Sequence, residues 1–471
     1  MSRVLMVTSE AVPFAKTGGL ADVLGALPPA LAKLGDEVVV VMPKYGSVQI
    51  PEASRIWGEM PLAVGPRLFT AAIDQVERGG VRYLFADCPA LYAGMGVYNE
   101  AGVDYPDNHI RFALLNQAAI GIARQIFRPD ILHGHDWPAG LLAPYLRENY
   151  SSDPALRGIK CVFTIHNLGY QGIFPGPIMA ELGLSPALFH PEGLEFWGQV
   201  NFLKAGIVWS DAITTVSPTY AQEIQTAELG FGLDGVLRAR AARITGILNG
   251  VDYEEWNPEH DPHLRYRYSS RRLTGKPFAK FALLKEMNLP LIEKRPLIGI
   301  VSRFAYQKGF DLVEAIAPQL AEENLFLVVL GSGDAHFENM FRQLAADYPD
   351  KVAVHIGFDN GLSHRIEAGA DLFLMPSRYE PCGLSQMYSL RYGTVPVVRA
   401  TGGLEDTVDE STGFKFAEYA PGALLDTVEK ALAEWHFRKP WRERMRLGMA
   451  KDFSWEASAA GYQRLYKELM S

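Results

Sequence analysis

An alternation of short apolar runs with stretches of helical periodicity constrains this chain more than any other feature of its sequence. The runs are rich in Val and Ile, and such runs are typical of strands buried on both faces of a parallel sheet. In the first half of the chain the pattern predicts strands at Val4–Val7, Val38–Met42, Ile131–His133, Cys161–Ile165, Ala212–Val216 and Ile244–Leu248. It predicts helices at Leu20–Leu34 and Asn108–Ile126.

Residues 68–87 depart from this alternation. Two runs of alternating hydrophobicity flank Arg78-Gly79-Gly80, and glycines at such a turn are typical of a hairpin. We therefore expect one antiparallel hairpin at the edge of an otherwise parallel sheet.

The alternation restarts after a polar, Arg-rich stretch at 252–276. The second set predicts strands at Leu297–Val301, Leu325–Leu330, Val352–Ile356, Leu372–Met375 and Val395–Val398, with helices at Gly309–Leu320, Phe337–Asp347, Ser363–Ala368 and Cys382–Tyr392. Two such sets predict two α/β domains, each a doubly wound parallel sheet, with a boundary near 245–250. Because ligands bind at the carboxyl ends of strands in such sheets, two facing domains would place a site in the cleft between them.

The charge and the cysteines exclude several classes of function. Lys and Arg number 45 and Asp and Glu number 54, which gives a formal charge of −9, whereas a general nucleic-acid-binding protein would have a basic excess. No apolar run approaches the ~18 residues of a transmembrane helix, and the N-terminal residues predict a first strand rather than a signal peptide. Cys88, Cys161 and Cys382 are far apart and form no CxxC pair, which favours a reducing cytoplasm.

Two glycine pairs follow predicted strands. Lys16-Thr17-Gly18-Gly19-Leu20-Ala21-Asp22 leads from the first strand into a helix, where two glycines allow a ligand to approach the backbone closely. Lys16 adds a charge suited to phosphate, although a tight turn would use the same glycines. Thr401-Gly402-Gly403-Leu404 has the same character in the second domain, and alone it would be interpreted as a strand-to-helix turn.

Two cations follow the first strand of the second domain. Arg303 and Lys308 lie just beyond the strand Leu297–Val301, before a helix. Two cations at that place could hold a polyanion, and each would attract a negative charge about 4 Å away by roughly 4 kcal/mol at an effective dielectric of 20. The alternative is that both side chains are simply solvated.

A third motif, Pro376-Ser377-Arg378-Tyr379-Glu380-Pro381-Cys382-Gly383-Leu384, follows a buried strand. Glu380 precedes a proline at an expected first helical turn, where proline is tolerated. The amides of Gly383 and Leu384 would then face outward from a helix N-terminus. Glu380 could equally be an acid that only stabilises the helix dipole.

Histidines mark the ends of two strands in the first domain. His133 and His135 are two residues apart, so their side chains are expected on one face of an extended segment. No third ligand stands at a recognisable spacing, so a metal site is not favoured. His166 ends the next strand; it could be a core histidine, but this place favours the cleft. No GxSxG motif or His–Cys pair is present, so covalent hydrolysis has little support.

Seven motifs together resemble the bacterial glycogen synthase family, which is similar to plant starch synthases. They are KTGGLADV at 16–23, HGHDW at 133–137, TIHNLGYQG at 164–172, LNGVD at 248–252, SRFAYQKG at 302–309, SRYEPCGLSQ at 377–386 and TGGLEDTV at 401–408. Each motif alone has little specificity. Seven such motifs, in the same order over almost the whole chain, do not arise together by chance.

The resemblance implies a GT-B fold, in which two Rossmann-like domains face each other across a deep cleft. Residues 1–247 would form the first domain and 248–455 the nucleotide-sugar-binding domain. Residues 456–471 would pack back onto the first domain, and Trp455–Ser471 has a helical pattern with Tyr462, Leu465 and Leu469 on one apolar face. The implied reaction transfers glucose from ADP-glucose to the non-reducing end of an α-1,4-glucan such as glycogen, with retention at the anomeric carbon.

The resemblance also implies roles for individual residues. The catalytic set would contain Arg303 and Lys308, which would grip the ADP diphosphate, and Glu380 and His166 beside the transferred glucose. The residues expected to bind the donor and its ADP part are Lys16, Gly18, Gly19, Asp22, Asn249, Phe358, Cys382, Gly383, Leu384 and Thr401. Tyr98 and Asp136 would face the donor sugar or the acceptor.

Two departures from the family pattern bear on specificity. Many retaining GT-B transferases carry a second Glu eight residues after the first, but Tyr388 stands there, as is typical of the glycogen synthase branch. Phe358, which would lie against adenine, lacks the hydroxyl of a tyrosine, so UDP-glucose remains an alternative donor.

Two other classes of function fit the sequence less well than this family. A glucan phosphorylase would need pyridoxal phosphate on a lysine, and no lysine has that context. A glucan-binding scaffold would not need Glu380, Arg303 and Lys308 together. Because Arg and Lys can neutralise a diphosphate, we expect no metal or other cofactor. From the acidic charge balance and the absence of a long apolar run, we expect no nucleic acid or membrane partner.

Overall fold

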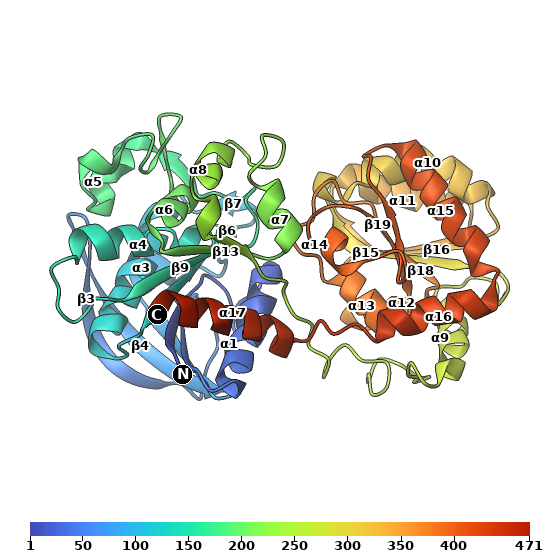
Figure 1. The fold of residues 1–471 in the computed structure, drawn as a ribbon, viewed down its shortest axis with the longest axis horizontal. Coiled ribbons are helices and arrows are strands. Elements are labelled where there is room, and N and C mark those ends of the chain that lie inside the picture. Colours follow the sequence, from blue (N-terminus) through green and yellow to red (C-terminus); the bar gives the residue numbers. More distant parts are fainter. The chain divides into compact units, whose positions relative to one another are not determined.

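The chain folds into two units, each built around its own parallel sheet (Figure 1). The computed structural model describes residues 1–471. Unit 1 comprises Met1–Gly250 and Trp455–Ser471, and unit 2 comprises Val251–Ser454. The change from unit 1 to unit 2 falls three residues after the boundary expected from the sequence, and the return falls one residue before it. No helix in the structure is long and apolar enough to cross a membrane.

The sheet of unit 1 has nine strands in the order β14-β13-β9-β8-β1-β2-β5-β4-β3. Its parallel part contains β1 (Arg3–Val7), β2 (Glu37–Pro43), β8 (Ile131–His135), β9 (Lys160–Ile165), β13 (Ala212–Thr215) and β14 (Ile244–Gly246). The six strands predicted from the apolar runs are all present. The parallel register places Val4 beside both Val38 and Ile131, so the strands are apolar where they begin, while the buried His133 and His135 stand nearer the carboxyl end of β8.

The predicted hairpin is also present, although a further strand lies outside it at the sheet edge. It consists of β4 (Arg67–Arg78) and β5 (Val81–Asp87), which pair antiparallel, while β5 lies parallel to β2. A further edge strand, β3 (Ser54–Val64), was not predicted. Most of its residues are exposed, and the alternation of buried and exposed residues begins only at Met60, so the sequence offered little periodicity.

The helices of unit 1 pack on the faces of this sheet. The two predicted helices are α1 (Gly19–Lys33) and α3 (Asn108–Gln125), and α3 is buried over most of its length. The shorter elements are α2 (Pro89–Tyr92), β6 (Asn99–Glu100), β7 (Val103–Asp104), α4 (Leu142–Pro144), β10 (Ile173–Pro175), α5 (Met179–Leu182), β11 (Glu195–Phe196), β12 (Gln199–Asn201), α6 (Phe202–Trp209), α7 (Pro218–Glu223) and α8 (Asp234–Ala239).

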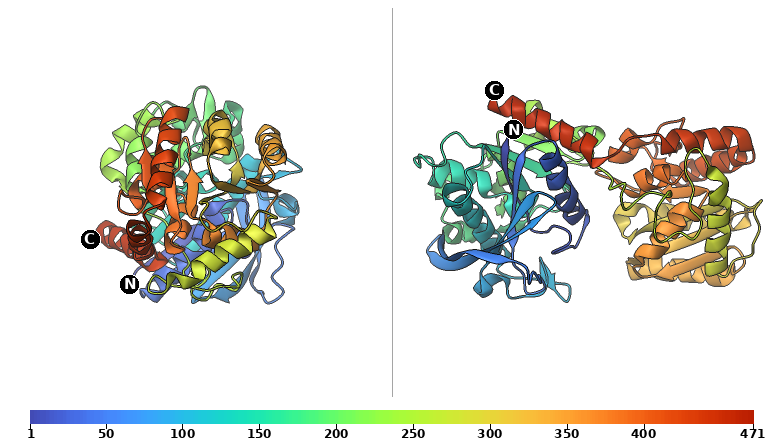
Figure 2. Two further views of the ribbon diagram at one scale, coloured as in Figure 1. Left: turned by 90° about the vertical axis from the view of Figure 1, so that its right-hand side faces the viewer. Right: turned by 90° about the horizontal axis from the view of Figure 1, so that it is seen from below.

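The last helix of the chain, α17 (Trp455–Met470), returns to unit 1 and lies beside α1 (Figures 1 and 2). The predicted apolar face is confirmed, because Tyr462 is buried and Leu465 and Leu469 pack against the core of unit 1. Tyr466, which was not predicted, is also fully buried, and its hydroxyl lies 2.8 Å from Nδ1 of His133. The end of the chain thus contributes to the core around β8.

Unit 2 has a six-stranded sheet in the order β17-β16-β15-β18-β19-β20, or 3-2-1-4-5-6 along the chain. This is the order of dinucleotide-binding α/β folds. The strands are β15 (Leu297–Phe304), β16 (Phe326–Gly333), β17 (Val352–Ile356), β18 (Leu372–Met375), β19 (Val395–Arg399) and β20 (Phe414–Phe416). The five predicted strands are present, and β20 is additional.

The four helices predicted in unit 2 are present, one with a later start, alongside four others. They are α9 (Lys276–Glu286), α10 (Phe310–Glu322), α11 (Ala335–Asp347), α12 (Asn360–Gly369), α13 (Ser385–Arg391), α14 (Gly402–Thr407), α15 (Pro421–Trp435) and α16 (Arg438–Met449). The expected helix from Cys382 to Tyr392 begins only at Ser385. The reason is local: Gly383 has a φ of 71°, which a right-handed helix does not allow.

In both units the strand order reverses once. The reversal lies between β1 and β8 in unit 1 and between β15 and β18 in unit 2. In sheets of this kind, the crevice outside the carboxyl ends of the two strands at the reversal is where ligands bind. The fold therefore points to two places, one on each unit, at which functional groups are expected.

Replacing Tyr466 by Ala tests how firmly the last helix is held. The change removes a fully buried aromatic ring and the partner of His133, so we expect unit 1 to lose about 3–5 kcal/mol of unfolding free energy. Urea unfolding followed by circular dichroism measures this loss. Glu468→Ala, at an exposed position of the same helix, should change it by less than ~0.5 kcal/mol. Equal effects of the two substitutions would show that α17 does not stabilise unit 1.

Candidate active-site groups on the two units

A buried carboxylate organises the loop between β1 and α1. Glu10 is 3% exposed, and its oxygens accept hydrogen bonds from the Thr17 amide, the Thr17 hydroxyl and, at 3.2 Å, the Gly18 amide. Two amides of this loop, those of Thr17 and Gly18, are therefore taken by Glu10 rather than left for a ligand. Glu10 was not among the residues expected from the sequence, although an acid shortly after a buried first strand could have drawn attention to it.

The glycine pair in this loop is not required by the backbone itself. Gly18 has an extended conformation, and a Cβ built on Gly18 or Gly19 would meet nothing within 4 Å. Open space in front of two glycines is what close approach of a ligand to the backbone needs. Lys16 lies beside this space, and its Nζ forms a 2.6 Å ion pair with Asp22 of α1.

The hydroxyl of Tyr98 is held inside unit 1. It lies 2.7 Å from Oγ of Ser9 and 3.0 Å from Oε1 of Glu10. The Tyr98 ring contacts those of Phe112 and Trp137. Tyr98 thus fixes the Glu10 carboxylate, which holds the Lys16 loop. Because its hydroxyl has these partners, the predicted contact of Tyr98 with a sugar would be made by the rest of the side chain, and the residue is partly exposed.

Asp136 follows β8 with an unusual backbone and an unusual carboxyl group. Its φ of 55° and ψ of −177° lie in a region that is nearly restricted to glycine. The strain is held by the side chain, since Oδ1 accepts a 2.7 Å hydrogen bond from the His166 amide. Burial raises the pKa of Asp136 to about 7, although the amides of His166 and Asn167 act in the opposite direction. Strain and a raised pKa together mark a functional position.

His166 and Asn249 complete the predicted residues of unit 1. Burial lowers the pKa of His166 to about 3, so its ring is neutral at physiological pH. Its Nε2 lies 3.0 Å from Nδ1 of His135, a contact the sequence did not reveal. Asn249 is buried, and its Oδ1 has no hydrogen-bond partner in the protein. An orphaned acceptor of this kind is expected where a ligand supplies the donor.

The two histidines of β8 are committed to protein contacts. As expected, their rings lie on one face of the strand, with centroids 4.2 Å apart. Both ring nitrogens of His133 have partners, the hydroxyls of Tyr466 and Thr164. No group of three or more His, Cys, Asp or Glu side chains is arranged to hold a metal ion.

In unit 2, Lys308 and Glu380 form one ion pair across the strand reversal. Nζ of Lys308 lies 2.6 Å from Oε2 of Glu380, which also accepts a 3.0 Å hydrogen bond from Ser377. Glu380 is 5% exposed. Gly309, with φ of 74°, makes this approach possible, because a Cβ there would lie 2.0 Å from the carbonyl oxygen of Pro376. The sequence had assigned Lys308 and Glu380 to separate parts of the substrate.

Two further predicted residues of unit 2 are exposed. The guanidinium of Arg303, at the end of β15, makes no ion pair or hydrogen bond within the protein. Phe358 follows β17 and is 88% exposed, with no ring neighbour. A charged group and an aromatic ring without protein partners are both available to a ligand.

The loop from Glu380 to Leu384 rests on the second glycine pair. A Cβ on Gly402 would lie 1.9 Å from the carbonyl oxygen of Glu380, and one on Gly403 would lie 2.0 Å from that of Cys382. These glycines therefore position the Glu380 loop, a role the sequence did not indicate. Thr401 and Cys382, predicted to contact the donor, are both buried beside this contact.

The helix N-terminus expected at Gly383 and Leu384 needs correction. Because α13 begins at Ser385, Leu384 is its cap residue and Gly383 lies before it in left-handed conformation. The helix has only seven residues. Any donors that Gly383 and Leu384 offer are thus loop amides rather than the first amides of a helix.

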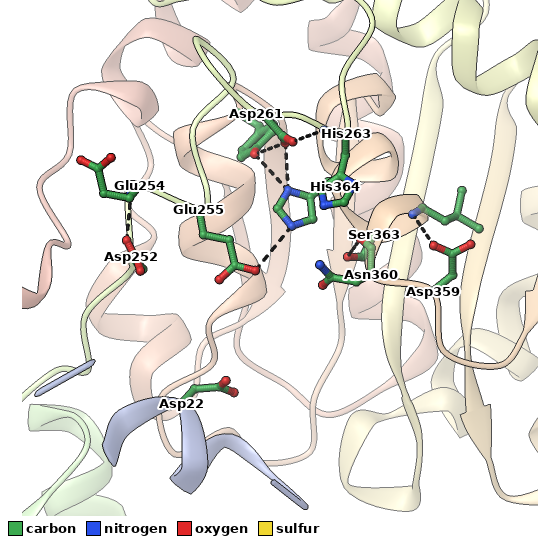
Figure 3. Close-up of polar contacts among 12 residues, drawn as sticks. Asp22, Asp252, Glu254, Glu255, Asp261, His263, Asp359, Asn360, Ser363 and His364 are labelled. Atoms are coloured by element: carbon green, nitrogen blue, oxygen red, sulfur yellow. Dashed lines mark hydrogen bonds and ion pairs between the residues drawn. The ribbon is translucent and has the colours of Figure 1, made fainter. Parts of the chain in front are cut away.

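Tyr388, at the position of the second Glu of other transferases, lies in a stack of rings. It is stacked on Trp256 at 3.8 Å, and the His364 ring is also stacked on Trp256 at 3.8 Å. Figure 3 shows Asp261 at Nδ1 of His364, 2.8 Å away, and Glu255 facing Nε2 at 3.9 Å. The Arg-rich stretch that separates the two predicted strand sets thus folds onto α12 and α13, and Tyr388 supports the helix after the Glu380 loop.

The structure brings the predicted residues together within each unit at the strand reversal. In unit 1, Lys16 and Asp22 follow β1, Asp136 follows β8, and Asp136 binds the backbone of His166. In unit 2, Lys308 after β15 meets Glu380 after β18. Each reversal therefore carries a polar group of defined geometry.

Asp136 should make the stability of unit 1 fall as pH rises. Its folded pKa of about 7 lies above the usual value near 4, so its full contribution is present below ~4 and is lost as pH rises to ~7. Asp136→Asn carries no such charge. We expect the variant to gain about 2 kcal/mol over the parent on going from pH 5 to pH 8, as measured by urea unfolding.

Asp104, which is exposed in β7, provides the control for this measurement. Asp104→Asn should differ from the parent by the same small amount at both pH values. A pH-independent difference for Asp136→Asn as well would refute the raised pKa.

Comparison with known proteins gives a family for both units. Residues 3–239 match the model of the starch synthase catalytic domain, and residues 285–447 match that of glycosyl transferases group 1. The chain is 50% identical to glycogen synthase of Anaeromyxobacter dehalogenans (strain 2CP-C), with 99% of each chain covered. It is 49% identical to glycogen synthase of Koribacter versatilis (strain Ellin345), with 99% of this chain and 98% of the relative covered.

Solved structures agree with this assignment. The catalytic domain of starch synthase IV from Arabidopsis thaliana, bound to ADP and acarbose, matches with a TM-score of 0.90 at 32% identity, covering 100% of this chain and 99% of that one. A sucrose-phosphate synthase from Thermosynechococcus elongatus, with a TM-score of 0.63 at 18% identity, shares the fold alone. The chain therefore belongs to the glycogen and starch synthase family of glycosyltransferases and has the GT-B fold of two Rossmann-like units.

Proposed function

We propose that this enzyme transfers glucose from ADP-glucose to the non-reducing end of an α-1,4-glucan such as glycogen, with retention at the anomeric carbon and release of ADP. The observation that carries the proposal is the group at the reversal of unit 2. There an unpaired Arg303 lies at the end of β15, and Lys308 and the buried Glu380 face each other at 2.6 Å. A cationic pair beside one buried carboxylate suits a sugar diphosphate.

The cations would act on the leaving group. Breaking the bond between glucose and phosphate develops negative charge on ADP, and fixed cations stabilise that charge without having to reorganise. Each cation about 4 Å from a phosphate oxygen contributes roughly 4 kcal/mol at an effective dielectric of 20. Lys308 is held by Glu380, whereas Arg303 needs no internal bond to be broken before it binds phosphate.

Glu380 would act on the sugar. Its carboxylate is buried and bound by Lys308 and Ser377, so its direction is fixed before the substrate arrives. Positive charge develops on the glucose ring as the bond to phosphate breaks, and a nearby carboxylate stabilises it. The same oxygens can accept a hydrogen bond from a sugar hydroxyl.

Unit 1 would supply the remaining contacts. Lys16 and the open space at Gly18 and Gly19 suit the phosphates, while Asp136 and His166 suit the hydroxyls of glucose. Support comes from the starch synthase IV structure, which has ADP and acarbose bound and matches this chain over its full length. Neither unit alone carries the whole set, so we propose that both act on one donor.

We further propose front-face transfer without a metal ion. The only buried carboxylate at the unit 2 reversal, Glu380, is held in an ion pair, and no other nucleophile is indicated there. The leaving phosphate would then take the proton of the attacking glucan hydroxyl on the same face of the sugar. Because Arg303 and Lys308 can neutralise the diphosphate, no divalent cation is needed. The three cysteines form no disulfide, in line with a cytoplasmic enzyme.

UDP-glucose is the second candidate donor. The reason is Phe358, whose exposed ring could stack on either base and offers no hydroxyl with which to distinguish them. Family membership favours ADP-glucose, since the relatives at about half identity are glycogen synthases.

The direct test measures incorporation of labelled glucose into glycogen from each donor. We expect transfer from ADP-glucose to exceed transfer from UDP-glucose and to survive treatment with EDTA. Faster transfer from UDP-glucose would refute the proposed donor. Loss of activity with EDTA that added metal restores would refute the metal-free mechanism, and no transfer from either donor would refute the proposed reaction.

Arg303→Ala isolates the contribution of one cation. Arg303 is exposed and unpaired, so the variant should fold normally while kcat falls by about 10²–10³ through loss of charge stabilisation in the transition state. Arg342→Ala removes an exposed arginine on α11 and should leave kcat within twofold. Wild-type turnover of Arg303→Ala would remove this residue from the mechanism. Lys308→Ala is less specific, because it also leaves the buried Glu380 without its partner.

A further inference from the structure

A buried imidazole and a partly buried one meet where β8 and β9 end. His135 is 0% exposed, and its Nδ1 lies 3.0 Å from Nε2 of His166. At that distance one nitrogen must carry the hydrogen and the other must accept it. His135 is the last residue of β8, and His166 directly follows β9, its parallel neighbour, so the sheet brings the two residues close together.

Both rings are neutral, which limits the arrangement to two possibilities. Burial lowers the pKa of His166 to about 3 and holds that of His135 well below its usual value, and the neighbouring histidines add to the effect on His135. Either His135 donates from Nδ1 to Nε2 of His166, or His166 donates from Nε2 to Nδ1 of His135. The two arrangements leave different hydrogens on the outer nitrogens.

The other nitrogen of His135 decides between them. Its Nε2 is buried and has no hydrogen-bond partner in the protein. If His166 were the donor, His135 would have to carry its hydrogen on Nε2, and a buried N–H would be left without an acceptor. Orphaned N–H groups are rarer in proteins than unused acceptors. The structure therefore favours His135 with its hydrogen on Nδ1.

We propose that His135 is a positioning residue that fixes His166 as the Nδ1–H tautomer, so that His166 presents an N–H donor to an oxygen of the transferred sugar. This inference rests on the proposed function for the identity of the ligand. The Nε2 edge of His166 is taken by His135, whereas Nδ1 makes no hydrogen bond within the protein. The open edge of His166 is therefore a donor and not an acceptor.

The surroundings hold both the ring and the backbone of this pair. The His135 ring packs against that of His133, with centroids 4.2 Å apart, and His133 is held between the hydroxyls of Tyr466 and Thr164. Asp136 binds the amide of His166 at 2.7 Å. A hydrogen bond within such a fixed frame sets the tautomer without requiring a charged partner.

Variants of His135 with the same shape test the proposal by kinetics. His135→Asn places an amide nitrogen where Nδ1 stands and keeps the donor, whereas His135→Leu has a similar shape and no donor. We expect His135→Asn to keep at least a third of kcat and His135→Leu to lose about 10- to 100-fold, with the KM for glycogen unchanged. His436→Leu, at an exposed site of unit 2, should match the parent. Equal turnover of the Asn and Leu variants would overturn the proposal.

A double substitution separates positioning from folding. If His135 acts through His166, adding His135→Leu to His166→Ala should lower kcat by less than twofold further. A full, multiplicative second loss would mean that His135 acts in another way, such as by supporting the fold of unit 1. Thermal unfolding of every variant accompanies the kinetics.

The tautomer itself can be read without activity. In the full chain labelled with ¹⁵N-histidine, the long-range ¹⁵N–¹H spectrum should show His166 protonated at Nδ1 and bare at Nε2, with the signal assigned by its loss in His166→Ala. A His166 protonated at Nε2 would overturn the proposal. This spectrum needs no substrate and no folded His135 variant, so it stands even if the proposed donor is wrong.

Discussion

The reversal of strand order in each parallel sheet is the constraint on which the rest of this molecule depends. Connections that leave the two strands at a reversal run to opposite faces of the sheet, so the carboxyl ends of those strands remain open. Between β1 and β8 of unit 1 the open end carries the Lys16 loop and Asp136. Between β15 and β18 of unit 2 it carries Lys308 and Glu380. The strand order alone thus brings residues that are far apart in the sequence close together.

The groups at these reversals are held in place before a substrate binds, although backbone strain and buried charge there lower the stability of the fold. Asp136 keeps a backbone conformation suited to glycine because its own side chain binds the His166 amide. Glu380 is a buried carboxylate that would be costly without Lys308. Glu10, equally buried, holds two amides of the Lys16 loop. Such fixed dipoles and charges need not reorganise when charge develops in the reaction, which is how polar sites accelerate group transfer.

Sequence periodicity predicted every parallel strand of unit 1 and five of the six strands of unit 2, because strands buried on both faces must be apolar throughout. It failed where one residue overrides the pattern. Gly383, with φ of 71°, delays α13 until Ser385, and no periodicity reports such an angle. The site residues were found through motifs after strands, but their mutual contacts were not. The pairing of Lys308 with Glu380 joins residues 72 apart, and His135 meets a residue that follows the neighbouring strand. The partners of Glu10 are amides of its own loop, and no periodicity reports the direction in which they point.

Hydrogen exchange tests most directly the proposal that both units hold one donor. Amide exchange of the full chain would be followed by mass spectrometry with and without ADP-glucose, in the absence of glucan. We expect the donor to slow amide exchange over the same range of donor concentration in residues 16–22 of unit 1 and in residues 302–309 and 380–384 of unit 2. Protection confined to one unit, at donor concentrations that saturate binding, would contradict the claim that the two reversals serve one substrate.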